Sequence, residues 1–356
     1  MQRVRLLTAL IIAVAVAGCS SASTAAPAAS APAASAPAQA SAAPSSAAAT
    51  KFAFIGALVH PVYSNVPQAL QDAAAAYGIS PVPVFTTPQE FDQVQQNTIV
   101  DGLIANGYTG LSIQVDDPVA GNDTITKIAA QGIYVVATGG CPEQPTKAPF
   151  CMATDTKQMA YLAATNVISA MGGKGNLVHL TGQPQDVNTQ HSIDGVAQAI
   201  AEHPGIKLIQ TITGLDESAQ AAANIVSSLL ASKRNQIDGI VSTSGDATPE
   251  IATEFTRLGE KRIKAVGINI SPTTILDAIK AGYLTGTMAQ NIYGQGYLAM
   301  YSLKLMTEGC TWNGPFNIDT GAFFVNQTNV DNAVQGLAQL TTNLAQDWKT
   351  KYWTCP

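Results

Sequence analysis

Short apolar runs of strand length alternate with helix-length segments through most of this chain, and this alternation restricts its fold more than any single motif. The apolar runs begin at Phe52, Pro81, Gly110, Tyr134, Gly175, Ile206, Asp238, Ile263 and Leu284. The segments between them, such as 89–105 and 216–232, carry apolar residues at helical spacing. Nearly continuous apolar strands separated by helices predict parallel sheets covered on both faces. We therefore expect an α/β fold of the doubly wound kind.

The predicted strands form two series, which meet near Asp155. The second series starts with its own glycine-rich turn, in the segment "MGGKGNLVHLTG". About 300 residues follow residue 50, which is too many for one small core and enough for two. Two similar series predict two lobes with a cleft between them, and ligands of open α/β sheets bind beyond the carboxyl ends of the strands. The residues that follow each strand are therefore the candidates for a binding site.

Residues 1–19 have the pattern of an export signal. Arg3 and Arg5 precede an apolar run over residues 6–17. This run is shorter than the about 20 residues that a membrane-spanning helix needs, so we interpret it as the core of a signal peptide. The small residues before Cys19 resemble the lipobox of bacterial lipoproteins, whose cysteine becomes the lipidated first residue; an ordinary secretory signal with a chance cysteine is the alternative. We expect an exported protein, lipid-anchored through Cys19 to the outer face of the bacterial cell membrane.

Residues 20–50 consist almost entirely of alanine, proline and serine, without charged or aromatic residues. Such a segment cannot bury enough apolar surface to offset the entropy lost on ordering, and its prolines keep it extended. We predict that it is a disordered tether between the lipid anchor and the folded part.

The chain has five cysteines, and their number favours disulfides. With Cys19 lipidated, an even number remains, which is typical of disulfide pairing in an exported protein. Proximity in the sequence favours the pairs Cys141 with Cys151 and Cys310 with Cys355. A metal site is the alternative, but the chain contains no CxxC or HxxxH pair. We expect neither a metal nor another cofactor.

Other classes of function are disfavoured by charge and by missing motifs. The net charge is −6 and no basic cluster occurs after residue 50, which argues against a nucleic-acid partner. The chain lacks a GxSxG nucleophile motif, the GxxxxGK[ST] phosphate loop and a GxGxxG motif after its first strand. His60 with Asp155 or Asp246 is the nearest approach to an acid–base pair, and a histidine at a strand end is more commonly a ligand contact. We therefore expect a protein that is not an enzyme.

Several longer segments stand in a characteristic order between Lys51 and Gly309. They are "HPVYSNVPQALQDAAAAYGI", "GLSIQVDDPVA", "GIYVVAT", "GGKGNLVHLTG", "AVGIN", "AIKAGYLTGTMAQN" and "GQGYLAMYSLKLMTEG". In order and spacing they resemble the type 1 periplasmic binding proteins, in particular the ribose-binding-like group that serves sugar ABC transporters. The resemblance implies a solute-binding protein, a monomer, that is recognised by an ABC permease and its ATPase.

The resemblance also implies the domain organisation. Two lobes are expected to be joined by three crossovers, near Asp155, Gln290 and Ile318. The N-terminal lobe then comprises residues 51–154 and 290–317. The C-terminal lobe comprises residues 155–289 and 318–356, including a C-terminal extension that is pinned by Cys355.

Matching to the family places the first ligand positions in the N-terminal lobe. The opening asparagine of the family falls on His60. Its two stacking aromatic residues fall on Val62 and Tyr63, so that one ring is retained. Its Asp-Arg pair after the fourth strand falls on Gly139 and Gly140, and we expect these glycines to leave backbone N–H groups and open volume facing the cleft.

In the C-terminal lobe, the family's arginine three residues before a glycine falls on Ser192, with His191 beside it. The Asp of its Asn-Asp pair is kept as Asp246, the Asp of its Gly-Phe-Asp becomes Asn269, and the Gln of its Ala-Gln is kept as Gln290. With two further strand-end residues, the predicted ligand contacts are His60, Tyr63, Asn65, Gly139, Gly140, Asp155, His191, Ser192, Asp246, Asn269 and Gln290.

The replaced positions indicate the kind of ligand. Charged hydrogen bonds of the sort that hold sugar hydroxyls contribute about 1.5 to 3 kcal/mol each, and most of the family's charged partners are absent here. The sequence therefore predicts a small neutral polar ligand, such as a sugar or polyol held in a different way. A sensor that signals to a membrane receptor is the alternative to transport. A transcriptional regulator is disfavoured, because no helix-turn-helix precedes Phe52.

Overall fold

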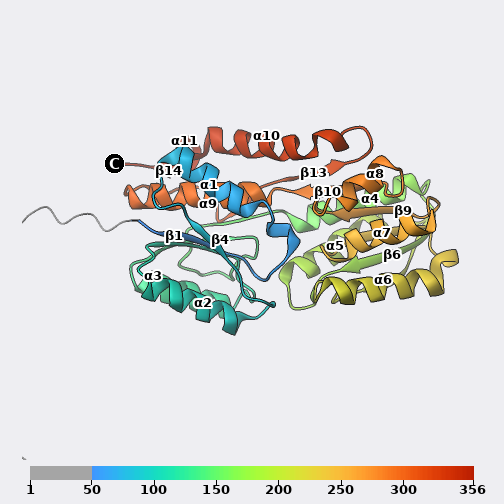
Figure 1. The fold of residues 1–356 in the computed structure, drawn as a ribbon, viewed down its shortest axis with the longest axis horizontal. Helices are drawn as coiled ribbons and strands as arrows, with labels where there is room; N and C mark the ends of the chain where they lie inside the picture. Colours follow the sequence, from blue (N-terminus) through green and yellow to red (C-terminus); the bar gives the residue numbers. More distant parts are fainter. Residues whose placement is uncertain (1–49) are drawn as a thin grey trace, which may run out of the picture. The chain divides into compact units, whose positions relative to one another are not determined.

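The computed structural model describes residues 50–356, which contain two six-stranded sheets, each flanked by helices (Figure 1). The predicted signal peptide, the lipidation site at Cys19 and residues 20–49 of the predicted tether lie outside the described residues. Within residues 50–356, no helix combines the length and the apolar character needed to cross a membrane.

The first sheet forms the N-terminal lobe, and all its strand pairs are parallel. Its strand order is β12-β5-β4-β3-β1-β2. The strands are β1 (Phe52–Ile55), β2 (Val84–Thr86), β3 (Gly110–Ile113), β4 (Tyr134–Thr138), β5 (Cys151–Ala153) and β12 (Asn317–Asp319). The helices are η1 (Pro61–Tyr63), α1 (Val66–Tyr77), α2 (Gln93–Ala105), α3 (Ala120–Ala130) and α9 (Ile292–Thr307).

Alternation along β1 shows why both faces of this sheet are covered. Phe52 and Phe54 pack with α1 and α9 on one face, whereas Ala53 and Ile55 pack with α2 and α3 on the other (Figure 1). Successive side chains of a strand point to opposite faces, so a strand that is apolar at every position needs helices on both sides. The predicted parallel, doubly covered sheet is thus confirmed for this lobe.

The second sheet forms the C-terminal lobe, with strand order β13-β10-β9-β8-β6-β7. Only β13 at its edge runs antiparallel to its neighbour. The strands are β6 (Gly175–Thr181), β7 (Ile206–Ile212), β8 (Gly239–Thr243), β9 (Lys264–Ile268), β10 (Gly286–Gln290) and β13 (Ala322–Val325). The helices are α4 (Thr156–Ala170), α5 (Val187–Ala201), α6 (Ala219–Lys233), η2 (Arg234–Gln236), α7 (Ala247–Leu258) and α8 (Thr274–Lys280).

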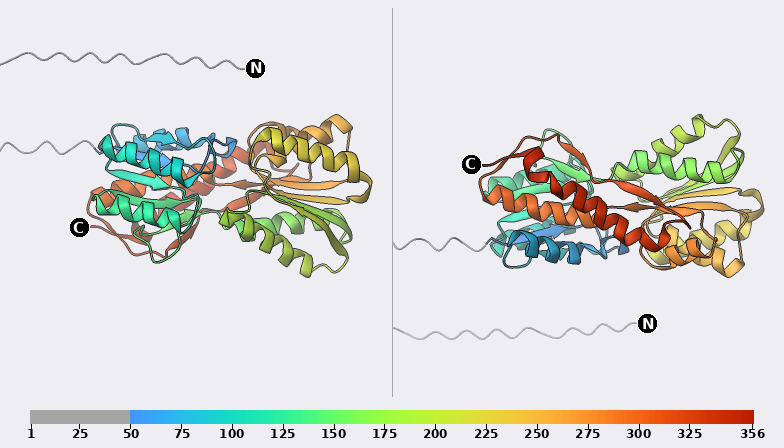
Figure 2. Two further views of the ribbon diagram at one scale, coloured as in Figure 1. Left: turned by 90° about the horizontal axis from the view of Figure 1, so that it is seen from below. Right: turned by 90° about the horizontal axis from the view of Figure 1, so that it is seen from above.

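Helices cover both faces of this sheet too, as Figure 2 shows for α6 and the α4–α5 pair. The α4–α5 pair packs closely because Gly195 of α5 lies against the carbonyl of Lys157 in α4, where a Cβ would overlap that oxygen. Before α10 (Ala333–Gln346), the chain passes between the lobes three times, from β5 to α4, from β10 to α9 and from β12 to β13. The predicted fold class, two doubly wound lobes joined by three crossovers, is confirmed.

The C-terminal extension departs from its expected place. After η3 (Val330–Asn332), helix α10 (Ala333–Gln346) packs against α9 of one lobe and β10 of the other (Figures 1 and 2). Helix α11 (Trp348–Tyr352) and strand β14 (Trp353–Thr354) then join the N-terminal lobe, where β14 pairs with β11 (Thr311–Trp312). The assignment of residues 348–356 to the C-terminal lobe is therefore wrong. The reason is that Trp348 and Trp353 are buried in the core of the N-terminal lobe.

Both predicted disulfides are present in the structure. Cys141 is bonded to Cys151 and Cys310 to Cys355, with Cα–Cα distances of 5.6 and 4.1 Å. They close separations of 10 and 45 residues. By the loop-entropy relation these bridges stabilise the fold by about 3 and about 4 kcal/mol. The second bridge ties the C-terminus to the end of α9.

Candidate functional site

A cavity of about 130 Å³ lies between the two lobes, at the carboxyl ends of their parallel strands. This is the position at which open α/β sheets bind ligands. Its wall combines apolar side chains with amides, hydroxyls and carboxylates from both lobes. Residues that line it include His60, Tyr63, Phe91, Gln114, Thr154, Asp186, Ser192, Asp216, Asn269 and Gln290.

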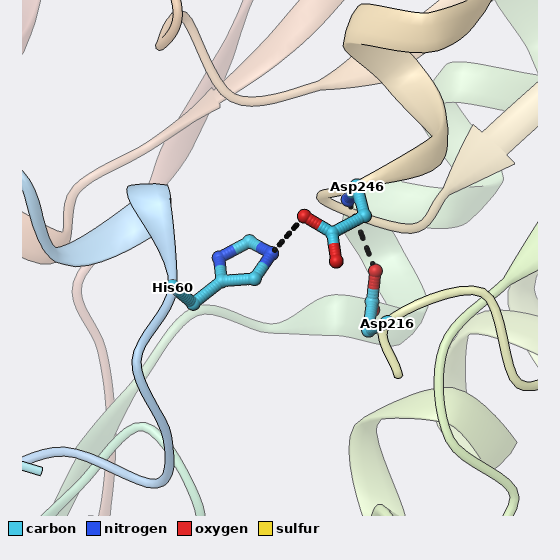
Figure 3. A group of neighbouring side chains, drawn as sticks. All are labelled: His60, Asp216 and Asp246. Carbon is cyan, nitrogen blue, oxygen red and sulfur yellow. Dashed lines mark hydrogen bonds and ion pairs between the residues drawn. The ribbon is translucent and has the colours of Figure 1, made fainter. Parts of the chain in front are cut away.

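His60 connects the lobes across this cavity. It precedes the short helix η1, and its Nδ1 accepts a hydrogen bond from the backbone N–H of Val62 at 3.1 Å. Its Nε2 lies 3.3 Å from Oδ1 of Asp246 in the other lobe, and both side chains are 8% exposed (Figure 3). An Nδ1 that accepts a hydrogen bond leaves the proton of a neutral imidazole on Nε2, which then points at the Asp246 carboxylate.

His60, Asp216 and Asp246 each present one atom that could hold a metal ion, and these atoms lie within 4.8 Å of one another (Figure 3). A histidine binds a metal through a ring nitrogen that carries no proton. In His60 the nitrogen nearest the carboxylates is the protonated one, because Nδ1 accepts from Val62. We therefore assign the cluster to polar contact between the lobes and not to metal binding.

Asp216 reaches the cavity through the loop after β7. Within that loop the N–H groups of Gly214 and Leu215 donate to the carbonyls of Gly182 and Thr181, which draws the loop back onto the end of β6. Oδ1 of Asp216 accepts hydrogen bonds from Ser244 Oγ at 2.5 Å and from the backbone N–H of Asp246 at 3.1 Å. These two hydrogen bonds fix Oδ1 of Asp216 in the cavity wall.

Asp186 is the second carboxylate in the wall. It caps the N-terminus of α5, where its Oδ1 accepts from the backbone N–H of Asn188 at 2.8 Å. Burial raises the pKa of both carboxyls, and the negative charge of Asp216 adds to the rise at Asp186. Burial therefore disfavours the ionised form of both groups unless a positive charge comes close.

Amide side chains complete the polar wall. The Tyr63 hydroxyl donates to Gln114 Oε1 at 2.7 Å, and Gln290 Nε2 donates to Asn269 Oδ1 at 3.1 Å. Asn269 has a φ of 69°, a left-handed conformation that non-glycine residues seldom adopt and that is frequent at binding sites. Its backbone N–H donates to the carbonyl of Met288, which holds this conformation in place.

Only some of the predicted site residues line the cavity. Those that line the cavity are His60, Tyr63, Gly139, Ser192, Asn269 and Gln290. Asp246 lies beside the cavity and contacts His60. Asn65 is exposed before α1, whereas Asp155 and His191 line an adjoining cavity of about 630 Å³ near the β5–α4 crossover, which shares Thr154 with the first. Their contact with a ligand stays a prediction.

The two glycines do not have the expected role. Their N–H groups are already used, because Gly139 donates to the Met152 carbonyl and Gly140 to the Thr138 carbonyl. A Cβ on Gly139, whose φ is 70°, would overlap Oε1 of Gln114. The expectation of free N–H groups and open volume is therefore wrong, since the Gln114 amide occupies that volume.

Some lining residues are not among the predicted contacts. Phe91 supplies an aromatic ring from the loop before α2, and Asp186 and Asp216 supply the carboxylates. A polar residue that caps the helix after a strand is the signal that could have identified Asp186. Asp216 offers no such signal, because its position depends on the loop that folds back onto β6.

Asp116, which follows β3, is 4% exposed, and its Oδ1 accepts from Gln96 Nε2 at 3.1 Å. Burial raises its pKa to about 8. The pKa of Asp116 in the folded protein thus lies above its value of about 3.9 in the unfolded chain. The protonated carboxyl therefore stabilises the protein fully below about pH 4, and this stability is lost as the pH rises through 8. We predict that Asp116→Asn is more stable than the wild type, by a margin that grows by about 2 kcal/mol between about pH 5 and pH 7. Urea unfolding at several pH values measures the margin.

The exposed Asp123 in α3 provides the control, because Asp123→Asn removes the same charge without relieving burial. Its unfolding free energy should follow that of the wild type across this pH range. Parallel pH curves for Asp116→Asn and the wild type would show that the Asp116 carboxyl is ionised in the folded protein at neutral pH.

With this geometry in place, comparison with known proteins identifies the family. The profile of the "Periplasmic binding protein domain" matches residues 54–310. The chain belongs to this family of periplasmic binding proteins. The predicted resemblance is therefore confirmed, and the relatives named below are solute-binding proteins and not enzymes.

Two curated relatives are binding proteins for small polyhydroxylated compounds. The xylitol-binding protein of Mycolicibacterium smegmatis is 26% identical over 204 residues, which cover 56% of each chain. The xylose/arabinose-binding protein XylF of Sulfolobus acidocaldarius is 22% identical over 248 residues, which cover 65% of this chain and 60% of that one. The chain thus spans less than two thirds of the length of these relatives.

Solved structures support the fold. A solute-binding protein of an ABC transporter from Burkholderia graminis, in complex with D-arabinose, has a TM-score of 0.72 and 24% identity, and the match covers 79% of this chain and 96% of that one. A second one from Agrobacterium vitis, bound with alpha-D-tagatopyranose, has a TM-score of 0.71 and 22% identity, with 82% and 98% covered. At this level of identity, the similarity shows the fold of this periplasmic binding protein and leaves its ligand open.

Proposed function

We propose that this protein binds a small polyhydroxylated solute, a sugar or polyol, between its lobes and delivers it to an ABC permease. The observation that carries this proposal is the inter-lobe cavity at the strand ends, with its many hydrogen-bonding side chains. A cavity of this kind, with apolar walls and a few placed polar groups, suits a small polar ligand. Xylitol and pentose binding by the curated relatives supports the same ligand class.

The proposal also includes the location of the protein at the cell surface. Export and lipidation at Cys19, on the outer face of the cell membrane, would hold the binding lobes within reach of a permease. Residues 20–50 would serve as the tether. Cleavage before Cys19 and a lipid-modified N-terminus in the membrane fraction, measured by mass spectrometry, are the expected observations.

A thermal-shift screen across sugars and polyols tests the ligand class. A solute present at about 100 times its dissociation constant should stabilise the folded protein by about 2.7 kcal/mol. Calorimetry with the best compound then tests the site. We predict that His60→Ala and Asn269→Ala each lower its affinity at least about tenfold, since each removes a polar contact in the cavity wall.

Two variants outside the cavity serve as controls. His203→Ala removes a histidine side chain from the loop between α5 and β7, and Asn343→Ala removes an asparagine side chain from α10. Neither residue lines the cavity. Their affinities should match that of the wild type. Unchanged affinity in both His60→Ala and Asn269→Ala would show that the solute binds elsewhere, and a screen without any stabilising sugar or polyol would contradict the ligand class.

A further inference from the structure

We propose that the bound solute carries a positively charged amine, as in an amino sugar or amino polyol, and that Asp186 and Asp216 bind this amine. The proposal rests on the proposed function, because it places the amine on a solute in the same cavity. It replaces the expectation of a neutral ligand, which followed from the replaced charged positions and was made without Asp186 and Asp216 among the predicted contacts.

The charged side chains in the cavity wall are acidic. Among the described residues that line it, Asp186 and Asp216 are acidic, and neither lysine nor arginine occurs. Two carboxylates thus stand in the wall without a lysine or arginine among the described lining residues.

The protein itself provides little to balance these carboxylates. Among the described lining residues one imidazole occurs, that of His60; its Nε2 lies 3.3 Å from Asp246, and one of its ring nitrogens lies within 4.8 Å of Asp216, so it is shared between two carboxylates. Asp216 receives neutral donors from Ser244 and from a backbone N–H, and Asp186 receives a backbone N–H. Neutral donors orient a carboxylate, but they do not neutralise its charge.

Partial burial of Asp186 and Asp216 makes their uncompensated negative charge unfavourable without a cationic ligand. A buried ionised carboxylate is unfavourable unless an opposite charge pairs with it. The raised pKa values of Asp186 and Asp216 express the same cost. A ligand ammonium group removes it, because it supplies the missing positive charge and offers three N–H donors to the carboxylates of the wall.

The remaining wall suits the hydroxyl groups of such a solute. Thr154 lines the cavity, is 6% exposed, and its Oγ1 has no hydrogen-bond partner among the described residues. Buried hydroxyls are rarely left unpaired, so this one points to a ligand group. A hydroxyl of the solute would pair with Thr154 while the amine pairs with the carboxylates.

Matched pairs of compounds test the proposal. Calorimetry at about pH 7 with EDTA present compares D-glucosamine with D-glucose, D-galactosamine with D-galactose, and D-glucamine with D-sorbitol. In at least one pair the amine should bind at least about tenfold more tightly than its neutral counterpart. A thermal-shift measurement with each compound gives an independent readout.

Two variants, each of which removes one carboxylate charge, test whether Asp186 and Asp216 cause the preference for the amine. Asp216→Asn keeps an oxygen that can accept from Ser244, and Asp186→Asn keeps a residue that caps helices well, so both should fold. Each should lower the ratio of the affinity for the amine to that for its neutral counterpart at least about tenfold. Glu217→Gln, which removes an exposed charge next to Asp216, should change neither affinity.

The outcomes separate this inference from the proposed function. Equal or tighter binding of every neutral compound would overturn the amine proposal and leave the sugar or polyol function intact. Binding of the amine that is seen only when EDTA is left out would also overturn it, because a metal ion would then fill the acidic site. If no compound of any pair binds, the amine inference fails, and the screen across sugars and polyols decides the proposed function separately.

Discussion

Replacing Gly245 by alanine is expected to weaken solute binding at least about 100-fold, or about 2.7 kcal/mol, while both lobes stay folded. Gly245 lies between β8 and α7 in the C-terminal lobe, and a Cβ there would overlap Cε1 of His60 in the N-terminal lobe. His60 cannot easily move aside, because its Nδ1 accepts a hydrogen bond from the backbone N–H of Val62 and its side chain is only 8% exposed. The added methyl group should therefore hold the lobes apart and leave the cavity incomplete. Calorimetry with the solute found in the screen measures the loss.

A second substitution and a control make this result specific. In the double variant Gly245→Ala with His60→Ala, the overlap is removed, and part of the lost affinity should return relative to Gly245→Ala alone. Gly102→Ala in α2 adds the same methyl group where no atom lies within 4 Å, and it should leave binding unchanged. Full affinity in Gly245→Ala would show that the solute is bound without the contact between Gly245 and His60.

Trp348→Ala is expected to destabilise the protein by about 3 to 5 kcal/mol, as truncation of a large core residue typically does. Trp348 is fully buried, and its Nε1 donates to Ser302 Oγ of α9 at 3.0 Å. Its ring lies 5.6 Å from that of Trp312 and 6.1 Å from that of Phe150, measured between centroids. The alanine variant removes these contacts and leaves the buried Ser302 hydroxyl without this donor. The free energy of urea unfolding measures the loss.

Two further variants serve as controls for Trp348→Ala. Trp348→Phe keeps an aromatic ring but removes the N–H donor, so its loss should be smaller than that of Trp348→Ala. Val334→Ala in α10 shortens a side chain that is 64% exposed and should change stability by less than about 0.5 kcal/mol. A loss below about 1 kcal/mol for Trp348→Ala would mean that the C-terminal segment is not part of the core of the N-terminal lobe.

Local patterns were sufficient to predict the framework of the fold. The apolar runs at Phe52, Gly110 and Ile263 are strands or flank them directly, and Gly78 ends α1 in the left-handed conformation expected of a helix cap. These features depend on residues close together in the chain. The alternation of apolar strands and helices therefore predicted the two doubly wound lobes without knowledge of their contacts.

The candidate site was predicted less completely. His60, Asn269 and Gln290 follow predicted strands and line the cavity, because strand ends converge at one edge of a sheet. Gly139 also lines it, but the side chain of Gln114 occupies the space beside that glycine. Which side chain fills a gap depends on packing between neighbouring strands, and no pattern along the chain records it.

The sequence by itself determined the α/β fold class, the two lobes and the pairing of the cysteines, because these follow from periodicity, proximity and composition. Only the tertiary structure decided that Asp186 and Asp216 line one cavity that has no lysine or arginine among its described lining residues, and that Trp348 returns to the N-terminal lobe. The physical reason is that these features depend on contacts between residues far apart in the chain. The charge of the cavity, and with it the proposed amine, is a property of the folded lobes together.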